Sequence, residues 1–426
     1  MKNFSLSQRD RQVIWHPYSQ HGLNRQILPV VKSHGAYLEL EDGQKILDAI
    51  SSWWVNLHGH AHPALVHAAQ KQASQLEQVI FAGFTHEPAI ELAEALIQYS
   101  PLNKARMSKV FYSDNGSTAV EVALKMAYQF HWNQGIRTRK KFLALSQSYH
   151  GDTLGAMAVG EPDGFHQLFR SLLPHVDFIE LGQLNHLQER LKVNGNQYAA
   201  FIFEPLVQGA AGMRSVNIDF LEKAVELCQE KGVLAICDEV FTGFYRTGKC
   251  FAFEHTQIVP DLICLSKGIT GGFLPLAVTL TSEKVYEAFL SQEIKTAFLH
   301  GHSYTANPIA CAVALESWKL LWSQECQSRI QEICRITQDR ISKMFAHRKI
   351  KDARCFGTIG AIEMKLDLNY FSSQAGQTVN LLDAALKKNV LLRPLGNVVY
   401  AVPPYCIKNS ELHRIYDVME ELADDL

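Results

Sequence analysis

Two polar residues of the sequence follow or end short apolar runs and have side chains that could take part in catalysis. Asp238 ends the run Val233–Asp238, and Lys267 comes shortly after the run Leu262–Leu265. A carboxylate that is partly withdrawn from water needs a positively charged partner. A lysine in such a place can have a lowered pKa and act as an amine nucleophile. Each residue also has a simpler interpretation, because an aspartate can cap a turn after a strand and most lysines are exposed to solvent.

A third segment, Asp114–Thr118, could bind an anion. It follows the apolar run Lys109–Ser113 and opens a long amphipathic stretch, STAVEVALKMAYQFHW. Small residues at the start of a helix let backbone N–H groups approach an anion, and the helix dipole favours a phosphate there. Gly116 and Ser117 are the candidate phosphate ligands. A Ser or Thr helix cap after a glycine turn is the alternative, and it is the commoner meaning of such a segment.

Together, the lysine, the acid and the anion-binding segment are the parts that a pyridoxal 5'-phosphate (PLP) enzyme requires. The lysine forms a Schiff base with PLP, the carboxylate keeps the pyridine nitrogen protonated, and the helix N-terminus holds the phosphate. Each signal is weak alone. Their combination predicts PLP as the cofactor.

The pattern of the surrounding elements predicts an α/β fold that would bring these residues together. Between about residues 105 and 325, short apolar runs alternate with amphipathic segments, which indicates a mainly parallel sheet covered by helices. In such sheets, ligands bind beyond the carboxyl ends of the strands. The expected strands of this region are 109–113, 141–146, 199–206, 233–238, 262–265 and 274–281, with helices at 219–232 and from about 308.

The two ends of the chain are predicted to form a smaller α+β domain. Residues 1–55 contain a strand pattern at 36–40 and a turn at 41–43, and we expect them to pack with the C-terminal domain, residues 326–426. The large, PLP-binding domain would comprise residues 56–325. The C-terminal domain combines a helical stretch at 325–345 with strand-like pieces at 361–366, 390–393 and 398–402.

The composition indicates an ordinary globular protein with small-molecule partners. The chain has 426 residues, of which 47% are hydrophobic, and 41 Lys and Arg against 43 Asp and Glu give a net charge of −2. No run of like charges suggests binding to nucleic acid or to an anionic membrane. Nine cysteines without a C-x-x-C spacing indicate a reducing compartment. Because the N-terminus has no apolar leader and no stretch is long enough to span a membrane, we expect a cytoplasmic protein.

A run of three histidines offers a hypothesis of a different class. His58, His60 and His62 alternate along the chain, as zinc ligands on a strand can. A metal-dependent hydrolase is therefore an alternative. Gly59 and Pro63 argue for a loop instead, and no further Asp, Glu or His stands at a supporting spacing, so the sequence predicts no metal site.

Longer segments resemble a known family. The segment DEVFTGFYRTG and the following SKG resemble the signature of the class III aminotransferases, which are fold type I PLP enzymes. From about Trp15 to Tyr405 the chain resembles the 7,8-diaminononanoate synthases of that family. The resemblance implies a homodimer whose large domain contains a mainly parallel seven-stranded sheet, with a smaller α+β domain built from both termini. The other matching segments are WHPYSQ, SSWWVNLHGHAHP, FAGFTHEPAIELAEAL, SDNGSTAVEVALKMA, SYHGDTLGAM, EPLVQGAAGM, HGHSYTANPIACAVAL and RPLGNVVYAVPPY.

The resemblance implies roles at the cofactor ring for four residues. Lys267 would hold PLP as a Schiff base and move a proton between the substrate carbon and the cofactor. Asp238 would pair with the pyridinium nitrogen. Tyr149 would lie near the ring, and Val240 would pack against its opposite face.

The phosphate of PLP would, by the same resemblance, be bound from two subunits. Gly116 and Ser117 would bind it from one subunit, and His302 and Ser303 would complete the site from the other. Family members often have Pro-Thr at the latter two positions. Serine keeps the hydroxyl donor, so phosphate binding is expected to survive this departure.

The substrate pocket would be shaped by Tyr18, Trp53, Gly301 and Arg393, with contacts from Tyr149 and Lys267. Tyr18 is also a candidate catalytic residue, and Arg393 has the chemistry to pair bidentately with the carboxylate of a keto acid. A structural ion pair is the alternative for Arg393, and Trp54 is interpreted as a core aromatic.

Three further residues belong to the segments that carry the resemblance. Glu204 and Arg246 are second-tier candidates for the site. Tyr245 stands where the signature TGFGRTG has its middle glycine, so its bulk would either narrow the cavity or point to solvent.

The resemblance implies an activity. The enzyme would transfer an amino group from S-adenosylmethionine to 8-amino-7-oxononanoate, giving 7,8-diaminononanoate for biotin biosynthesis, in a ping-pong reaction through pyridoxamine phosphate. Some family members use lysine as the donor, and the residues leave that choice open. The alternatives are another class III aminotransferase acting on lysine, ornithine or 4-aminobutyrate, and a catalytically silent protein of the same fold, against which Lys267 and Asp238 argue.

Overall fold

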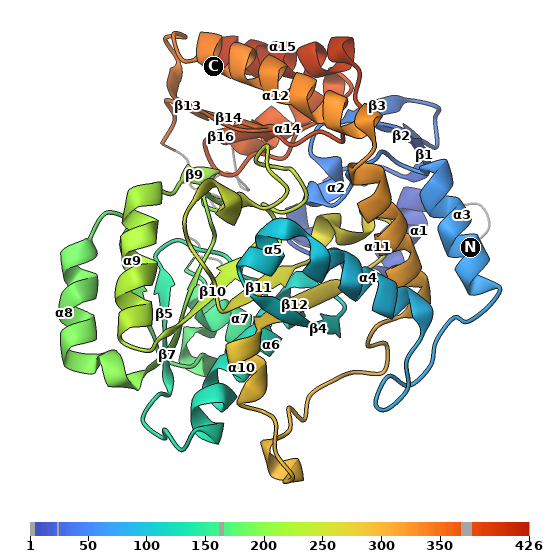
Figure 1. Cartoon of the computed structure of the whole chain (residues 1–426). Coiled ribbons are helices and arrows are strands. Elements are labelled where there is room, and N and C mark those ends of the chain that lie inside the picture. Colours follow the sequence, from blue (N-terminus) through green and yellow to red (C-terminus); the bar gives the residue numbers. More distant parts are fainter. Residues whose placement is uncertain (1–4, 24, 162–165, 368–376, 426) are drawn as a thin grey trace.

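A seven-stranded sheet forms the centre of the molecule (Figure 1). The computed structural model describes residues 5–23, 25–161, 166–367 and 377–425. Six strands of the sheet run parallel, and β12 is antiparallel to both of its neighbours. The predicted α/β class and mainly parallel sheet are therefore confirmed. In sheet order the strands are β4 (Met107–Ser113), β12 (Ala277–Ser282), β11 (Leu262–Leu265), β10 (Leu234–Asp238), β7 (Tyr198–Phe203), β5 (Lys141–Leu145) and β6 (Val176–Ile179).

Both faces of this sheet are buried because successive side chains of each strand enter two different apolar cores. In β10, for example, Ala235 and Cys237 belong to one core, and Leu234 and Ile236 belong to the other. One core is completed by α6 (Gly116–Asn133). The other is completed by α4 (Glu87–Gln98), α8 (Leu184–Asn194), α9 (Ile218–Glu230) and α11 (Pro308–Leu321).

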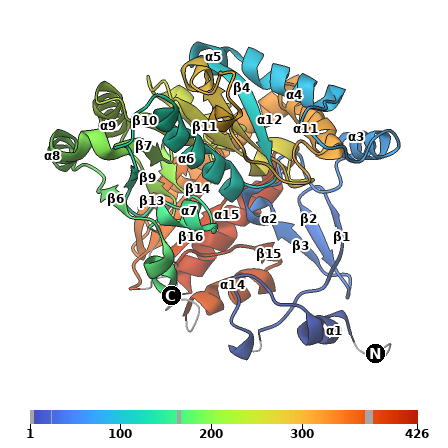
Figure 2. The same ribbon diagram turned by 90° about the horizontal axis from the view of Figure 1, so that it is seen from below.

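The two ends of the chain meet in a second group of elements (Figures 1 and 2). β15 (Val390–Leu391) pairs with β3 (Lys45–Asp48), which extends the sheet formed by β1 (Val30–His34) and β2 (Tyr37–Leu40). The proposed domain boundaries at 55 and 325 stay a prediction. The other C-terminal elements are β13 (Ile350–Phe356), β14 (Ile359–Met364) and β16 (Val398–Ala401), with α12 (Gln324–Met344), α14 (Gln377–Lys387) and α15 (Asn409–Asp424).

Shorter elements connect these parts. They are α1 (Leu6–Val13), α2 (Ser51–Trp54), α3 (Pro63–Ala73), α5 (Ser100–Lys104), α7 (Leu154–Ala158), α10 (Glu283–Glu287), β8 (Val207–Gln208) and β9 (Arg214–Ser215). None of the helices in the described ranges combines the length and apolar character that crossing a membrane requires. All nine cysteines are free.

Candidate active site

Five parallel strands direct the candidate residues to one edge of the sheet. Because β4, β5, β7, β10 and β11 share a direction, the segments after their carboxyl ends lie together. A cavity of about 590 Å³ opens there. Nine of the twelve residues predicted for the site line it: Tyr18, Trp53, Gly116, Ser117, Tyr149, Asp238, Val240, Lys267 and Arg393.

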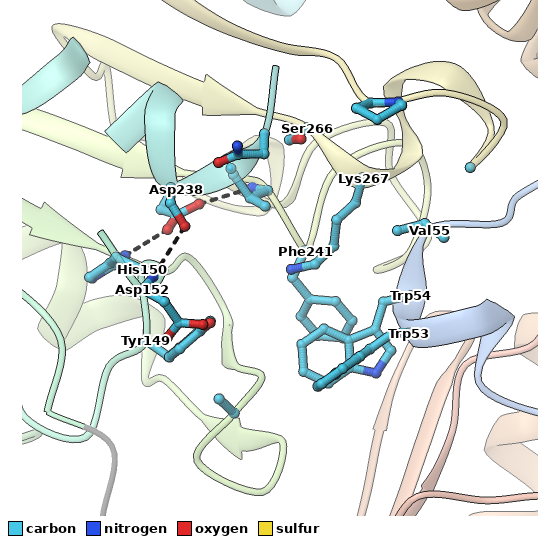
Figure 3. Close-up of a pocket in the computed structure, with 18 of the residues that line it drawn as sticks. Trp53, Trp54, Val55, Tyr149, His150, Asp152, Asp238, Phe241, Ser266 and Lys267 are labelled. Carbon is cyan, nitrogen blue, oxygen red and sulfur yellow. Dashed lines mark hydrogen bonds and ion pairs between the residues drawn. The ribbon is translucent and has the colours of Figure 1, made fainter. Parts of the chain in front are cut away.

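Lys267 points its amine into this cavity (Figure 3). The Nζ atom lies 4.9 Å from the ring centre of Trp54 and 5.8 Å from that of Phe241. Burial lowers the pKa of Lys267, although the carboxylates of Asp238 and Glu204 oppose the shift. A lowered pKa makes the neutral, nucleophilic amine more accessible. The interpretation of Lys267 as a solvent-exposed lysine is therefore wrong.

Asp238 ends β10 and is held by two hydrogen bonds. Its Oδ1 accepts the backbone N–H of Val240 at 3.0 Å, and its Oδ2 lies 2.6 Å from Nδ1 of His150 (Figure 3). Both side chains are buried. An ionised carboxylate only accepts hydrogen bonds, so the proton of this pair resides on Nδ1 of His150. His150 lies in the SYHG segment beside Tyr149 but was not predicted as a site residue.

The start of α6 forms a cradle with room only for glycine. Asn115 caps this helix by accepting the backbone N–H of Thr118 at 3.0 Å. A Cβ atom on Gly116 would lie 2.7 Å from Cγ1 of Val240, and one on Gly151 would overlap with the hydroxyl of Ser117. Gly116 and Ser117 line the cavity, so a phosphate there would meet the N-terminus of the helix.

Two tyrosines and an aspartate form one wall of the cavity. The hydroxyl of Tyr18 donates to Oδ2 of Asp152 at 2.6 Å and lies 3.4 Å from the hydroxyl of Tyr149. Burial raises the pKa of Asp152, but hydrogen bonds from His166, Tyr18 and Tyr149 outweigh that effect and lower it. This wall therefore presents a carboxylate whose charge is maintained.

Arg393 and Trp53 form another part of the wall. The guanidinium carbon of Arg393 lies 4.5 Å from the ring centre of Trp53, and the ring of Tyr18 meets Trp53 edge-on. Among the ion pairs of the described residues, none includes Arg393. Within the described residues, Arg393 therefore does not form the structural ion pair considered as an alternative. Its guanidinium is available to an anionic ligand.

The second-tier candidates differ in location. Glu204 lines the cavity, and burial raises its pKa to about 7. Its oxygens accept the backbone N–H groups of Tyr149 at 3.1 Å and Gly209 at 3.0 Å. Arg246 is fully buried outside the cavity, where it donates to the carbonyl oxygens of Asn56 and Pro403. Only Glu204 is therefore placed to act on a ligand.

Residues Ser51–Trp54 form one turn of left-handed helix. All four have positive φ, between 46° and 73°, and Trp54 N–H donates to the carbonyl of Ile50 at 2.7 Å. A left-handed conformation costs roughly 1–2 kcal/mol for each residue with a Cβ. Such strain persists only where the surroundings enforce it. The turn places both tryptophans on the cavity, and Trp54 also belongs to an apolar core, as predicted.

Tyr245 points away from the cavity. Its ring meets Trp322 edge-on with the centres 5.7 Å apart, and it does not line the cavity. Its φ of 72° lies in the region that favours glycine, which accounts for the glycine of the family signature at this position.

The three histidines of the HGHAH run do not meet at one point. Nε2 of His58 lies 3.0 Å from the hydroxyl of Ser317, whereas Nε2 of His60 lies 2.9 Å from Asp48. Burial lowers the pKa of His58 to about 3. Within the described ranges, no group of three or more His, Cys, Asp or Glu side chains could hold a metal ion. The run therefore gives the hydrolase hypothesis no support.

Gly301, His302 and Ser303 do not line the cavity of their own chain. The carbonyl of Ser303 accepts a hydrogen bond from the side chain of Gln78 at 2.6 Å, and the backbone N–H of His302 donates to Thr305. Their predicted roles at the site of a second subunit stay predictions.

Comparison with known proteins identifies the family. The family model described as "Aminotransferase class-III" matches residues 18–422, nearly the whole chain. The chain belongs to the class III aminotransferases.

Relatives of this class III aminotransferase cover its full length. A protein from Synechococcus elongatus named adenosylmethionine-8-amino-7-oxononanoate aminotransferase is 44% identical over 97% of this chain and 99% of its own. A crystal structure of the enzyme of that name from Methanocaldococcus jannaschii superposes with a TM-score of 0.93 at 33% identity, covering 99% and 98% of the two chains. A PLP-bound amine transaminase from an uncultivated Pseudomonas species has a TM-score of 0.89 at 28% identity, with 97% and 98% covered.

Class III aminotransferases are PLP-dependent, and the cavity of this member fits PLP. The amine of Lys267 could react with the aldehyde of PLP, and the buried carboxylate of Asp238 could pair with the ring nitrogen. The helix N-terminus at Gly116 could hold the phosphate. The three groups line one cavity. The PLP interpretation that the sequence suggested is confirmed, whereas the role of each residue stays a proposal.

Proposed function

We propose that this enzyme transfers an amino group from S-adenosylmethionine to 8-amino-7-oxononanoate, giving 7,8-diaminononanoate in biotin biosynthesis. Full-length relatives carry that activity in their names. The observation in the molecule that supports it most is the cation of Arg393, held on the cavity wall beside Trp53 without an ion pair in the described residues. A keto acid with a distant carboxylate suits such a group.

In this proposal Lys267 moves the proton. PLP, when bound, supplies a conjugated ring that withdraws the electrons left behind when the substrate carbon loses a proton. Nζ of Lys267 would accept and return that proton, because burial makes its neutral form accessible. The aromatic rings of Trp54 and Phe241 lie beside the amine.

Asp238 and His150 act at the ring nitrogen. The buried carboxylate of Asp238 would keep the ring nitrogen of bound PLP protonated, and His150 fixes the carboxylate through its Nδ1–H. A second hydrogen bond, from the backbone N–H of Val240, fixes the other carboxylate oxygen. The acid is thus oriented before any ligand arrives.

The two substrates use one pocket in turn, as a ping-pong reaction requires. Arg393 binds a substrate carboxylate, and Trp53 and Tyr18 shape the space around the rest of the molecule. The carboxylate of Asp152 accepts the Tyr18 hydroxyl and orients that ring.

We further propose that the enzyme is a homodimer in the cytoplasm. In the dimer, Gly301, His302 and Ser303 of one subunit complete the cofactor and substrate site of the other. Several large apolar side chains near this segment are exposed in the single chain, among them Leu299 and Tyr304, and a partner subunit would cover them.

Incubation of the purified, PLP-loaded protein with 8-amino-7-oxononanoate and one amino donor at a time tests this function. Mass spectrometry should detect 7,8-diaminononanoate with S-adenosylmethionine as the donor. Product formed only with lysine would correct the donor and keep the acceptor. No product with either donor, but turnover of ornithine or 4-aminobutyrate, would assign the chain to another branch of the family.

A further inference from the structure

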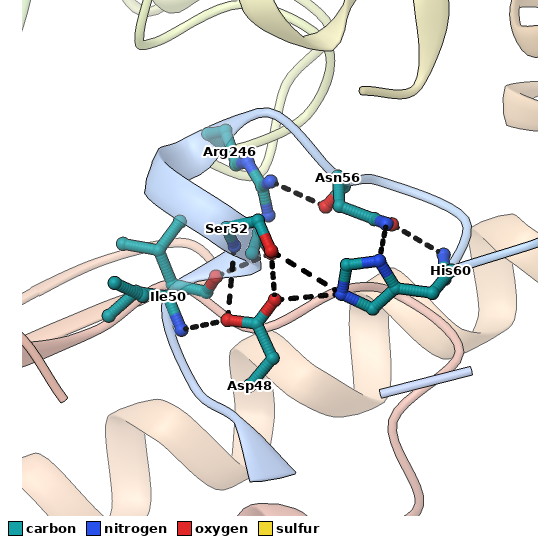
Figure 4. A network of polar contacts seen from close by, with 9 residues as sticks. Asp48, Ile50, Ser52, Asn56, His60 and Arg246 are labelled. Atoms are coloured by element: carbon teal, nitrogen blue, oxygen red, sulfur yellow. Dashed lines mark hydrogen bonds and ion pairs between the residues drawn. The ribbon is translucent and has the colours of Figure 1, made fainter. Parts of the chain in front are cut away.

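We propose that Asp48, together with Asn56 and His60, acts as a positioning group that holds Trp53 in place for substrate binding. The inference rests on the proposed function, in which Trp53 contacts the substrate. None of the three residues lines the cavity. They act through the left-handed turn Ser51–Trp54, to which Asp48 is joined by hydrogen bonds (Figure 4).

Asp48 is the centre of this positioning group. It ends β3, is 0% exposed, and accepts four hydrogen bonds. Oδ1 accepts the backbone N–H groups of Ile50 at 3.3 Å and Ser52 at 3.0 Å. Oδ2 accepts the hydroxyl of Ser52 at 2.7 Å and lies 2.9 Å from Nε2 of His60. Three of the four donors thus belong to the strained turn or to the residue that precedes it.

The orientation of His60 is determined by Asn56. The side-chain oxygen of Asn56 accepts the backbone N–H of Gly59 at 2.7 Å, so its amide nitrogen faces Nδ1 of His60 at 3.2 Å. That nitrogen can only donate, and Nδ1 must therefore be an acceptor. The proton of the neutral ring then lies on Nε2, where it is donated to Asp48. Along the chain from Asn56 to His60 to Asp48, each donor therefore faces an acceptor.

Arg246 fixes the far end of the turn. Its guanidinium donates to the carbonyl of Asn56 at 2.9 Å and to that of Trp54 at 3.4 Å. Burial lowers the pKa of Arg246, and the nearby carboxylate of Asp48 opposes this shift. The buried negative charge of Asp48 is therefore balanced within the same cluster.

The two tryptophans depend on the turn to different degrees. Trp54 is 5% exposed and packs against Phe241, with the ring centres 4.3 Å apart, so the core anchors it independently. Trp53 is 38% exposed, and the ring contacts it makes within the described ranges are those with Tyr18 and Arg393 at the cavity wall. Loosening the turn should therefore displace Trp53 first and weaken substrate binding more than the proton transfer at Lys267.

The substitution Asp48→Asn tests the proposal because its amide group places a donor against His60 or Ser52. We expect KM for both substrates to rise about tenfold and kcat to change by less than about threefold. The absorption spectrum of bound PLP should be unchanged. Asp42→Asn is the matched control, since Asp42 is exposed in the turn before β3 and, within the described part of the chain, accepts a single hydrogen bond, from the backbone N–H of Gln44. Its kinetics should equal those of the unmodified enzyme.

Adding Ser52→Gly to Asp48→Asn tests whether the conformation of the turn carries the effect. Glycine adopts positive φ without a steric penalty, so the double variant should recover most of the lost affinity. If Asp48→Asn merely lowered the stability of the fold, Ser52→Gly would not restore substrate affinity, because glycine makes the unfolded chain more flexible and so lowers stability further. Failure of the glycine to lower KM would overturn the proposal.

Hydrogen exchange of the backbone amides in residues 51–56 separates this inference from the proposed function. Faster exchange in Asp48→Asn, with a raised KM, is the expected result. Faster exchange with unchanged KM would overturn the positioning role. Unmodified enzyme that converts neither substrate would refute the proposed function, and unaltered exchange in Asp48→Asn would then refute the positioning group independently.

Discussion

Nδ1 of His150 lies 2.6 Å from Oδ2 of Asp238, and both side chains are buried at the carboxyl end of the central sheet. The two residues are 88 positions apart in the sequence. The contact fixes one oxygen of the acid, and the backbone N–H of Val240 fixes the other. The carboxylate that we propose for the ring nitrogen of PLP is thus held at both of its oxygens.

The first prediction concerns this hydrogen bond. Hydrogen bonds to charged groups contribute about 1.5–3 kcal/mol, so His150→Ala should lower kcat by at least about tenfold. The absorption maximum of bound PLP should shift, because the protonation of its ring nitrogen depends on Asp238. Steady-state kinetics and a visible spectrum measure both effects. Unchanged kcat and an unchanged spectrum would show that Asp238 needs no support from His150.

A second prediction follows from the burial of Glu204. Its pKa is raised to about 7 in the folded protein, so the folded state binds this proton more tightly than the unfolded state does. The stabilisation is complete below the ordinary pKa of a glutamate and is lost as the pH rises toward 7. Glu204→Gln does not titrate.

Chemical unfolding of the two proteins at pH 5 and pH 8 measures this effect. The free energy of unfolding of Glu204→Gln, relative to that of the unmodified protein, should rise by about 2–3 kcal/mol between the two pH values. A difference that stays constant with pH would mean that the Glu204 carboxyl keeps an ordinary pKa despite its burial.

The third prediction concerns Arg393. Arg393→Lys keeps the charge but loses the bidentate geometry, and Arg393→Ala loses both. We expect KM for 8-amino-7-oxononanoate to rise about tenfold in the first variant and about a hundredfold in the second. Arg335→Ala is a suitable control, because Arg335 is exposed and pairs with Glu332 three residues away. Equal KM values in all these proteins would remove Arg393 from the substrate site.

Much of the central sheet could be predicted from the sequence because its strands are short, apolar and buried on both faces. The expected run 262–265 coincides with β11, and 233–238 differs from β10 by one residue. The expected strand 199–206 ends earlier, at Phe203, and the chain then turns toward the cavity at Glu204. β6 was missed because it has only four residues, of which the middle two are half-buried.

The residues that support the site could not be predicted in the same way. Lys267, Asp238 and Gly116 stand at or shortly after the ends of apolar runs, where the local sequence marks them. His150 contacts Asp238, and Asp48 contacts His60, and in both cases the fold brings the two side chains together. The left-handed turn was also missed, because nothing in Ser51–Trp54 resembles the glycines and asparagines that usually adopt positive φ.

The most direct test of the central claim is the visible spectrum of the PLP-loaded enzyme during stepwise addition of its substrates. The band of bound PLP should disappear when S-adenosylmethionine is added and return when 8-amino-7-oxononanoate follows, and Lys267→Ala should show neither change. A band that responds to neither compound, or one that responds equally well in Lys267→Ala, would contradict the account.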